Sequence, residues 1–134
     1  KIIVVEKDLR KKKQALSSGV DLFLSYSDLS DLNTQLNEVK KIYGDPTVAI
    51  ETTGSVQMIE MCYEITSTEG RVVLVGVPNI NDRTSLYTLP LHFGKYLTGS
   101  KGGGSNPDVD IPFILSNNIN FTICGGTRSP VPQA

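Results

Sequence analysis

The chain alternates short runs of β-branched residues with amphipathic segments of helical length, and this alternation restricts the folds open to it. Residues 1–6 and 71–76 are nearly continuous apolar runs, which is typical of strands covered on both faces in a parallel sheet. Strands that alternate with helices form βαβ units. We therefore predict an α/β fold, a doubly wound and mostly parallel Rossmann-like sheet with helices on both faces.

Helix signals divide the chain into these elements. Asp8 can cap the first helix and Gly19 can end it, while Ser27 or Asp28 caps the second helix, which Gly44 ends. A short helix begins after Asn106, and residues 118–134 form an atypical tail. The predicted strands are 1–6, 20–26, 47–51, 71–76, 96–99 and 121–124, with 86–91 extended, and the predicted helices are 9–18, 28–43, 55–66 and 107–115.

Composition gives no sign of a nucleic-acid or membrane partner. The formal net charge is −1 over 134 residues, so no global field attracts a polyanion. The apolar runs are far shorter than the roughly 20 residues of a membrane span. We expect a cytoplasmic protein in which Cys62 and Cys124 are free thiols rather than a disulfide.

Glu6 directly follows the first strand, and an acid at this position holds a ribose in nucleotide-binding folds. The glycine-rich phosphate loop of that fold lies about 20 residues before the acid, whereas only five residues precede Glu6. We therefore expect residues 1–134 to be a single, partial dinucleotide-binding domain whose first β–α unit is missing.

That gap has a consequence for the sheet, because the missing strand would separate the 1–6 and 47–51 strands. These two strands could pair directly with each other, another polypeptide could supply the missing strand, or the chain could be part of a longer molecule. Unpaired backbone groups cost about 1–3 kcal/mol each when buried. We favour the third alternative.

The other strands are also followed by small or glycine-containing sequences. Ligands of doubly wound sheets bind at the carboxyl ends of the strands, and glycine lets the backbone approach a ligand closely. The sets are Thr52, Thr53 and Gly54; Gly76, Val77 and Pro78; and Ser100, Lys101 and Gly102.

Several of these segments together resemble the cofactor domain of zinc-type medium-chain alcohol dehydrogenases. They are Gly70-Arg-Val-Val-Leu-Val-Gly-Val-Pro78, Leu89-Pro-Leu, Leu97-Thr-Gly-Ser100 and Ile50-Glu-Thr-Thr-Gly-Ser55. The resemblance runs from Lys1 to about Ile114. It implies an enzyme that transfers a hydride between an alcohol or polyol and NAD or NADP.

The resemblance also implies cofactor contacts at these strand ends. Glu6 would bind the adenosine ribose and favour NAD over NADP, although Arg10 or Lys11 could neutralise a 2′-phosphate. Lys11 matches a position that flanks the adenine. The main chain at Thr52, Thr53 and Gly54 would line the adenine-side ribose, Gly76, Val77 and Pro78 would hold the carboxamide, and Ser100 and Lys101 would lie on the same side as the carboxamide.

No residue of the chain is predicted to be catalytic or to bind a metal. His92 is the only histidine and has no partners at metal-ligand spacing, and Glu51 is expected to pack under a loop or accept backbone hydrogen bonds. The resemblance places zinc in a separate catalytic domain, so the chain alone should be inactive. Its partners would be the cofactor and the rest of its own polypeptide, and residues 121–124 leave a homo-oligomer open.

Two other functions remain open at this point. A nucleotide-sensing module would bind NAD without chemistry, but it would need its own phosphate loop. A methyltransferase-like domain also places an acid after its second strand to hold a ribose. The Val75-Gly-Val-Pro78 turn and the Leu97-Thr-Gly-Ser100 strand favour the dehydrogenase.

Overall fold

The structure is a computed structural model that describes residues 1–101, 103–117 and 119. The chain divides into two compact units, residues 1–101 and residues 102–134, and each is described by itself. No helix in these described ranges is both long and apolar enough to cross a membrane.

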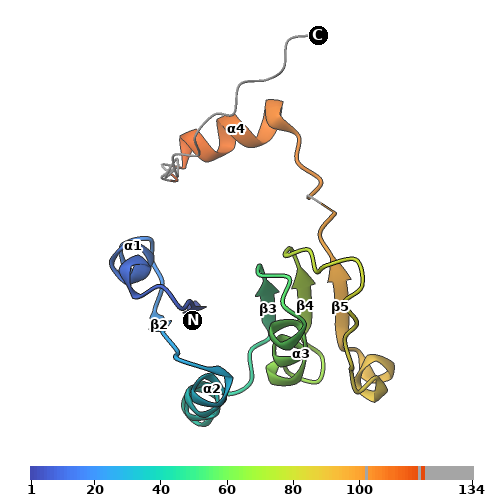
Figure 1. The fold of residues 1–134 in the computed structure, drawn as a ribbon. Helices are drawn as coiled ribbons and strands as arrows, with labels where there is room; N and C mark the ends of the chain where they lie inside the picture. Colours follow the sequence, from blue (N-terminus) through green and yellow to red (C-terminus); the bar gives the residue numbers. More distant parts are fainter. Residues whose placement is uncertain (102, 118, 120–134) are drawn as a thin grey trace. The chain divides into compact units, whose positions relative to one another are not determined.

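The first unit contains five short parallel strands in two sheets. In one sheet β1 (Ile3–Val5) pairs with β2 (Leu22–Leu24), and in the other β3 (Val48–Glu51), β4 (Arg71–Leu74) and β5 (Tyr96–Gly99) lie side by side (Figure 1). The alternation of strands and helices is therefore the predicted parallel α/β pattern. β1 and β3 do not pair with each other, so the alternative in which these two strands pair directly is wrong.

The helices begin and end where local sequence satisfies the backbone. The Asp28 side chain accepts a hydrogen bond from Asp31 N at the start of α2, and Gly44 ends that helix with a φ of 80°. The Asp8 side chain likewise accepts from Arg10 N. The helical elements of the first unit are η1 (Leu9–Lys11), α1 (Lys12–Ser17), α2 (Leu29–Tyr43), α3 (Val56–Ile65) and η2 (Leu89–Phe93).

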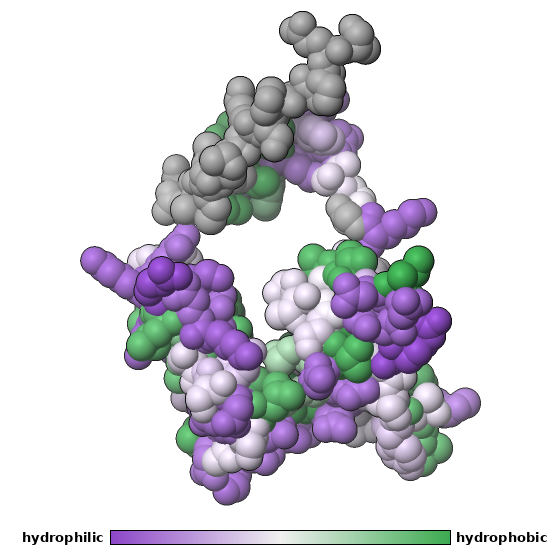
Figure 2. Space-filling view, viewed as in Figure 1, coloured by the Kyte–Doolittle hydropathy of each residue, from purple (hydrophilic) through white to green (hydrophobic). Residues whose placement is uncertain are grey.

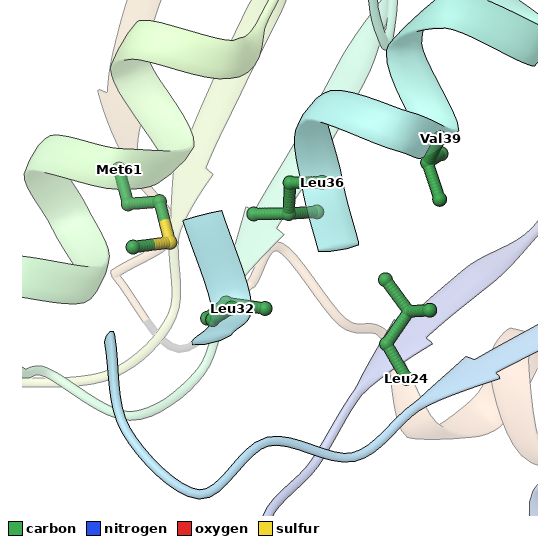
Figure 3. Packing of buried hydrophobic residues seen from close by; sticks show 5 residues of the cluster. All are labelled: Leu24, Leu32, Leu36, Val39 and Met61. Carbon is green, nitrogen blue, oxygen red and sulfur yellow. The ribbon is translucent and has the colours of Figure 1, made fainter. Parts of the chain in front are cut away.

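The core of the first unit lies between β2, α2 and α3. Leu32, Leu36 and Val39 form the buried stripe of α2, and they pack with Leu24 of β2 and Met61 of α3 (Figure 3). α3 also contacts β3 and β4, and it lies in front of the three-stranded sheet in Figure 1. This packing holds both sheets in one compact unit.

Burial of the first strand is lower than its sequence predicts. Ile3, Val4 and Val5 are half-buried, and Ile2 is 58% exposed. On β3, Val48 and Ile50 are also exposed, at 54% and 63%. These strands lack a neighbour on one side among the described residues, so part of each apolar face remains open.

The prediction of an extended segment at residues 86–91 is wrong for the second half of that segment. Residues Leu89–Phe93 form the short 3₁₀ helix η2, which has a proline in its first turn and ends at Gly94 with a φ of 104°. A proline at the first turn of a helix loses no intrahelical hydrogen bond, so Pro90 starts this element rather than interrupting a strand.

The described part of the second unit is α4 (Pro107–Ser116). The Asn106 side chain caps it by accepting from Asp108 N at 3.2 Å, and the helix continues through Pro112. The predicted strand at 121–124 and the rest of the tail lie outside the described residues.

Candidate functional site

The carboxyl ends of β3, β4 and β5 meet at one edge of their sheet. Glu51 is aligned with Leu74, and Leu74 with Gly99, so the three following loops leave the sheet at the same level, beyond the arrowheads of Figure 1. This register brings together the residues predicted after these strands. Parallel α/β sheets bind their ligands at this edge.

The loops after β3 and β4 touch through two glycines. A Cβ added to Gly76 would lie 2.1 Å from Gly54 N, and a Cβ added to Gly54 would lie 2.4 Å from Val77 O. Gly54 also has a φ of 72°, which side chains rarely adopt. The two glycines therefore allow a backbone-to-backbone contact that no other residue type fits.

The Glu51 side chain lies beneath this contact and is only 2% exposed. Its carboxylate accepts hydrogen bonds from the amide and hydroxyl of Thr53, at 2.6 and 2.5 Å, and from Gly54 N at 3.0 Å. Its main-chain carbonyl accepts from Val75 N at 2.7 Å and Gly76 N at 3.0 Å. The sequence predicts that Glu51 packs under a loop or accepts hydrogen bonds from the backbone, but it does not indicate that Glu51 joins both loops. Only the register of β3 and β4 reveals this link.

An open pocket of about 460 Å³ borders the two loops. It is lined by Thr53, Gly54 and Ser55 on one side, by Val56 and Gln57 at the start of α3, and by Val77, Asn79 and Asp82 on the other. A second pocket of about 290 Å³ shares Val56 and Asp82 with it and adds Pro78 and Leu97 to the lining. The predicted residues Thr53, Gly54, Val77 and Pro78 are thus next to pockets.

The segment after β4, which lines both pockets in part, carries exposed apolar side chains. Val77 is 87% exposed and Ile80 is 91% exposed in the segment after β4. Figure 2 shows apolar groups at the surface near the carboxyl ends of the three strands, among polar groups. Ligand pockets of proteins combine apolar side chains with a few polar groups in this way.

The other predicted residues lie at the same edge but outside the pocket linings. Thr52 is exposed directly after β3, and Gly76 is half-buried against the neighbouring loop. Ser100 N donates to Leu74 O at 2.9 Å, and exposed Lys101 has a φ of 49°. Ser100 and Lys101 therefore follow β5 where sequence predicts them.

Glu6 and Lys11 belong to the other sheet, at the carboxyl end of β1. The two are ion-paired at 2.5 Å, and Glu6 also accepts from Asp8 N at 3.0 Å. These hydrogen bonds, that from Lys11 first, lower the pKa of Glu6. Arg10 binds Asp8 at 2.8 Å and lowers the pKa of that carboxyl to about 2. Both acids are thus partly neutralised by neighbouring cations.

The described residues do not form a metal site. No group of three His, Cys, Asp or Glu side chains within those ranges is placed to hold an ion. Cys62 is a half-buried free thiol whose pKa is raised to about 11 by burial and by the charge of Glu51. His92 is exposed on η2, and Cys124 lies outside the described residues.

The family model described as zinc-binding dehydrogenase matches residues 1–116. No individual curated protein matches the chain.

Solved structures with the same fold include three dehydrogenases. The benzyl alcohol dehydrogenase of Acinetobacter calcoaceticus is 21% identical, with a TM-score of 0.74 over 87% of this chain and 32% of its own. A short chain alcohol dehydrogenase of E. coli CFT073 complexed with NADH is 20% identical, with a TM-score of 0.70 over 87% of this chain and 33% of its own. A putative zinc-binding dehydrogenase of Sinorhizobium meliloti bound to NADP is 16% identical, with a TM-score of 0.59 over 72% of this chain and 29% of its own.

These likenesses establish the Rossmann-like fold of the chain. The chain spans about a third of the length of each of these structures.

Proposed function

Because this chain belongs to the zinc-binding dehydrogenase family, we propose that it is the cofactor-binding part of a nicotinamide-dependent alcohol or polyol dehydrogenase. The observation that supports this best is the shared edge of β3, β4 and β5, where two glycine-linked loops border an open pocket of about 460 Å³. A dinucleotide cofactor in this family of folds lies along such an edge. The proposed whole enzyme moves a hydride between the cofactor and an alcohol.

The proposed contacts divide the cofactor between the two sheets. Glu6 would accept hydrogen bonds from the ribose hydroxyls of adenosine, which its two carboxylate oxygens allow, and Lys11 would flank the adenine. The main chain of Thr52, Thr53 and Gly54 would line the adenine-side ribose. The carboxamide would bind the main chain at Gly76, Val77 and Pro78, with Ser100 and Lys101 on its side.

NAD is the proposed cofactor, with NADP as the alternative. A carboxylate at Glu6 repels a 2′-phosphate and gains hydrogen bonds from the free hydroxyls. The ion pairs with Lys11 and Arg10 partly offset this repulsion, so discrimination between the two cofactors should be moderate rather than absolute.

Zinc chemistry does not fit the described residues. They provide no set of metal ligands, and therefore no step of the reaction is assigned to a metal held by them. We place the polarising metal, the alcohol site and the catalytic residues in another part of the enzyme. The 134 residues alone should not reduce NAD in the presence of an alcohol.

Titration of the full-length gene product with NADH, NADPH and S-adenosylmethionine tests this function. We expect nicotinamide fluorescence to report saturable binding of NADH, with NADPH binding more weakly and S-adenosylmethionine not competing. Competition by S-adenosylmethionine alone would point to a methyltransferase-like domain. Tight NADH binding without NAD reduction across a panel of alcohols and polyols would point to a sensing module.

A further inference from the structure

The buried carboxylate of Glu51 joins two loops that belong to different strands, and the proposed contacts with the cofactor do not use it. Its side chain is 2% exposed and holds the loop after β3 through Thr53 and Gly54. Its main chain holds the segment after β4 through Val75 and Gly76. One residue thus sets the position of both loops.

All the described partners of this side chain are donors. The amide of Thr53, its hydroxyl and the amide of Gly54 converge on the two oxygens of Glu51 within 3.2 Å. A carboxylate accepts at both oxygens, whereas an amide side chain accepts at one atom and donates at the other. Glutamine at this position would therefore turn a donor toward a backbone N–H.

The support that Glu51 gives to the two loops extends to the pocket through the contact between Gly54 and Gly76. Gly76 lies so close to the Thr53–Gly54 backbone that an added Cβ would be 2.1 Å from Gly54 N, and Val77 beyond it lines the pocket with Thr53 and Gly54. A shift of the Thr53–Gly54 loop would therefore move the opposite wall of the same pocket. Binding sites require support of this kind because their backbone groups must be held within about 0.5 Å of the productive geometry.

We propose that Glu51 is a positioning residue, which holds the loops after β3 and β4 at the mutual distance required by a dinucleotide whose adenosine half contacts the first loop and whose nicotinamide half contacts the second. This inference rests on the proposed function. Glu51 does not touch the cofactor itself. Its effect should therefore be larger on ligands that contact both loops than on adenosine ligands, which contact only the loop after β3.

The experiment compares two ligands in the full-length gene product. NADH spans both loops, whereas adenosine 5′-monophosphate lacks the nicotinamide half. For Glu51→Gln we expect the Kd for NADH to rise at least about tenfold, because the loss of one hydrogen bond between the cofactor and the displaced backbone weakens binding by about that factor. The Kd for adenosine 5′-monophosphate should rise less than about threefold.

Two further variants separate positioning from general destabilisation. Glu38→Gln is the matched control, because Glu38 is exposed and its only ion-pair partner in the described part of the chain is Lys41 on the surface of α2, and it should leave both constants unchanged. Thr53→Ala removes one donor to Glu51 and should produce a smaller change of the same kind. Circular dichroism at the assay temperature verifies that each variant is folded.

The outcomes separate this inference from the proposed function. A wild-type protein that binds no NADH would overturn the proposed function and this inference with it. Unchanged NADH binding by a folded Glu51→Gln variant would overturn the positioning role alone. An equal loss of NADH and adenosine 5′-monophosphate binding would also overturn it, since displacement of the loop after β3 alone, or general destabilisation, would then account for the result.

Discussion

The contact between Gly76 and the loop after β3 leads to a sharp prediction for Gly76→Ala. Gly76 does not have a positive φ, so alanine meets no conformational penalty of the left-handed kind. The only obstacle is steric. Its Cβ would lie 2.1 Å from Gly54 N and 2.6 Å from the amide nitrogen and the carbonyl carbon of Thr53.

The size of the effect follows from these distances. Ordinary van der Waals contact begins at 3.4 Å, so the Thr53–Gly54 backbone would have to move by more than about 1 Å. Overpacking of this kind costs about 1–3 kcal/mol. The movement would also stretch the hydrogen bonds to the Glu51 carboxylate, each with a net value of about 1.5–3 kcal/mol. We expect a loss of at least 3 kcal/mol, roughly 10 °C in the unfolding temperature of a domain of 134 residues.

Gly99→Ala is the matched control for this substitution. Gly99 ends β5 at the register level of Leu74, has no positive φ, and an added Cβ would meet nothing within 4 Å. The same chemical change should therefore alter stability by no more than about 1 kcal/mol. Calorimetry of the full-length gene product measures both variants, and an NADH titration reports the pocket.

One result would refute the reasoning. If Gly76→Ala unfolds within about 2 °C of the wild type and retains its NADH affinity, the two loops cannot be in the close contact described. A large effect of both glycine substitutions would instead mean that any side chain at this edge is harmful, and the specific steric argument would fail.

Three further predictions concern other parts of the molecule. Glu6→Gln should lower the preference for NADH over NADPH by about tenfold, because a charged acceptor for the ribose hydroxyls is lost; an unchanged ratio of the two Kd values in parallel titrations would contradict this. The pKa of Cys62 is raised to about 11 from 9.0 by burial and by Glu51, so at pH 8 its thiolate should be about a hundredfold scarcer than in unfolded chain. Peptide-resolved iodoacetamide labelling would measure this, and equal labelling rates in native and urea-unfolded protein would exclude it. Lys95→Ala should lower the free energy of unfolding by about 2 kcal/mol. The ammonium group of the buried Lys95 side chain donates to the main-chain oxygen of Tyr63 at 2.5 Å and lies 4.4 Å from the centre of the Tyr63 ring. Urea unfolding would test this, and a change below about 0.5 kcal/mol would refute it.

Local sequence signals predicted most of the secondary structure. Asp28 caps α2 and Gly44 ends it as expected, because cap and stop residues act through their own backbone and nearest neighbours. The stripe of Leu32, Leu36 and Val39 is buried as its helical spacing indicates. These features depend on residues within a few positions, and a sequence displays them directly.

Features that depend on packing were predicted less well. The sequence around Pro90 is compatible with an extended segment or a helical turn, and the structure has the turn. The apolar run at Ile3–Val5 indicates a fully buried strand, but its burial is partial, since the number of neighbouring strands is a property of the sheet. The contacts of Glu51 with two loops were likewise hidden until the register of β3 and β4 was known.

By itself the sequence determined the parallel α/β class, the positions of the strand-end loops and the family resemblance. The family model that matches residues 1–116 confirmed this resemblance. These follow from periodicity, caps and short motifs, which are local. The tertiary structure alone decided that Gly54 and Gly76 face each other and that Glu51 holds both loops. That arrangement arises from the alignment of separate strands, because hydrogen bonding across the sheet, rather than adjacency in the chain, brings those backbones together.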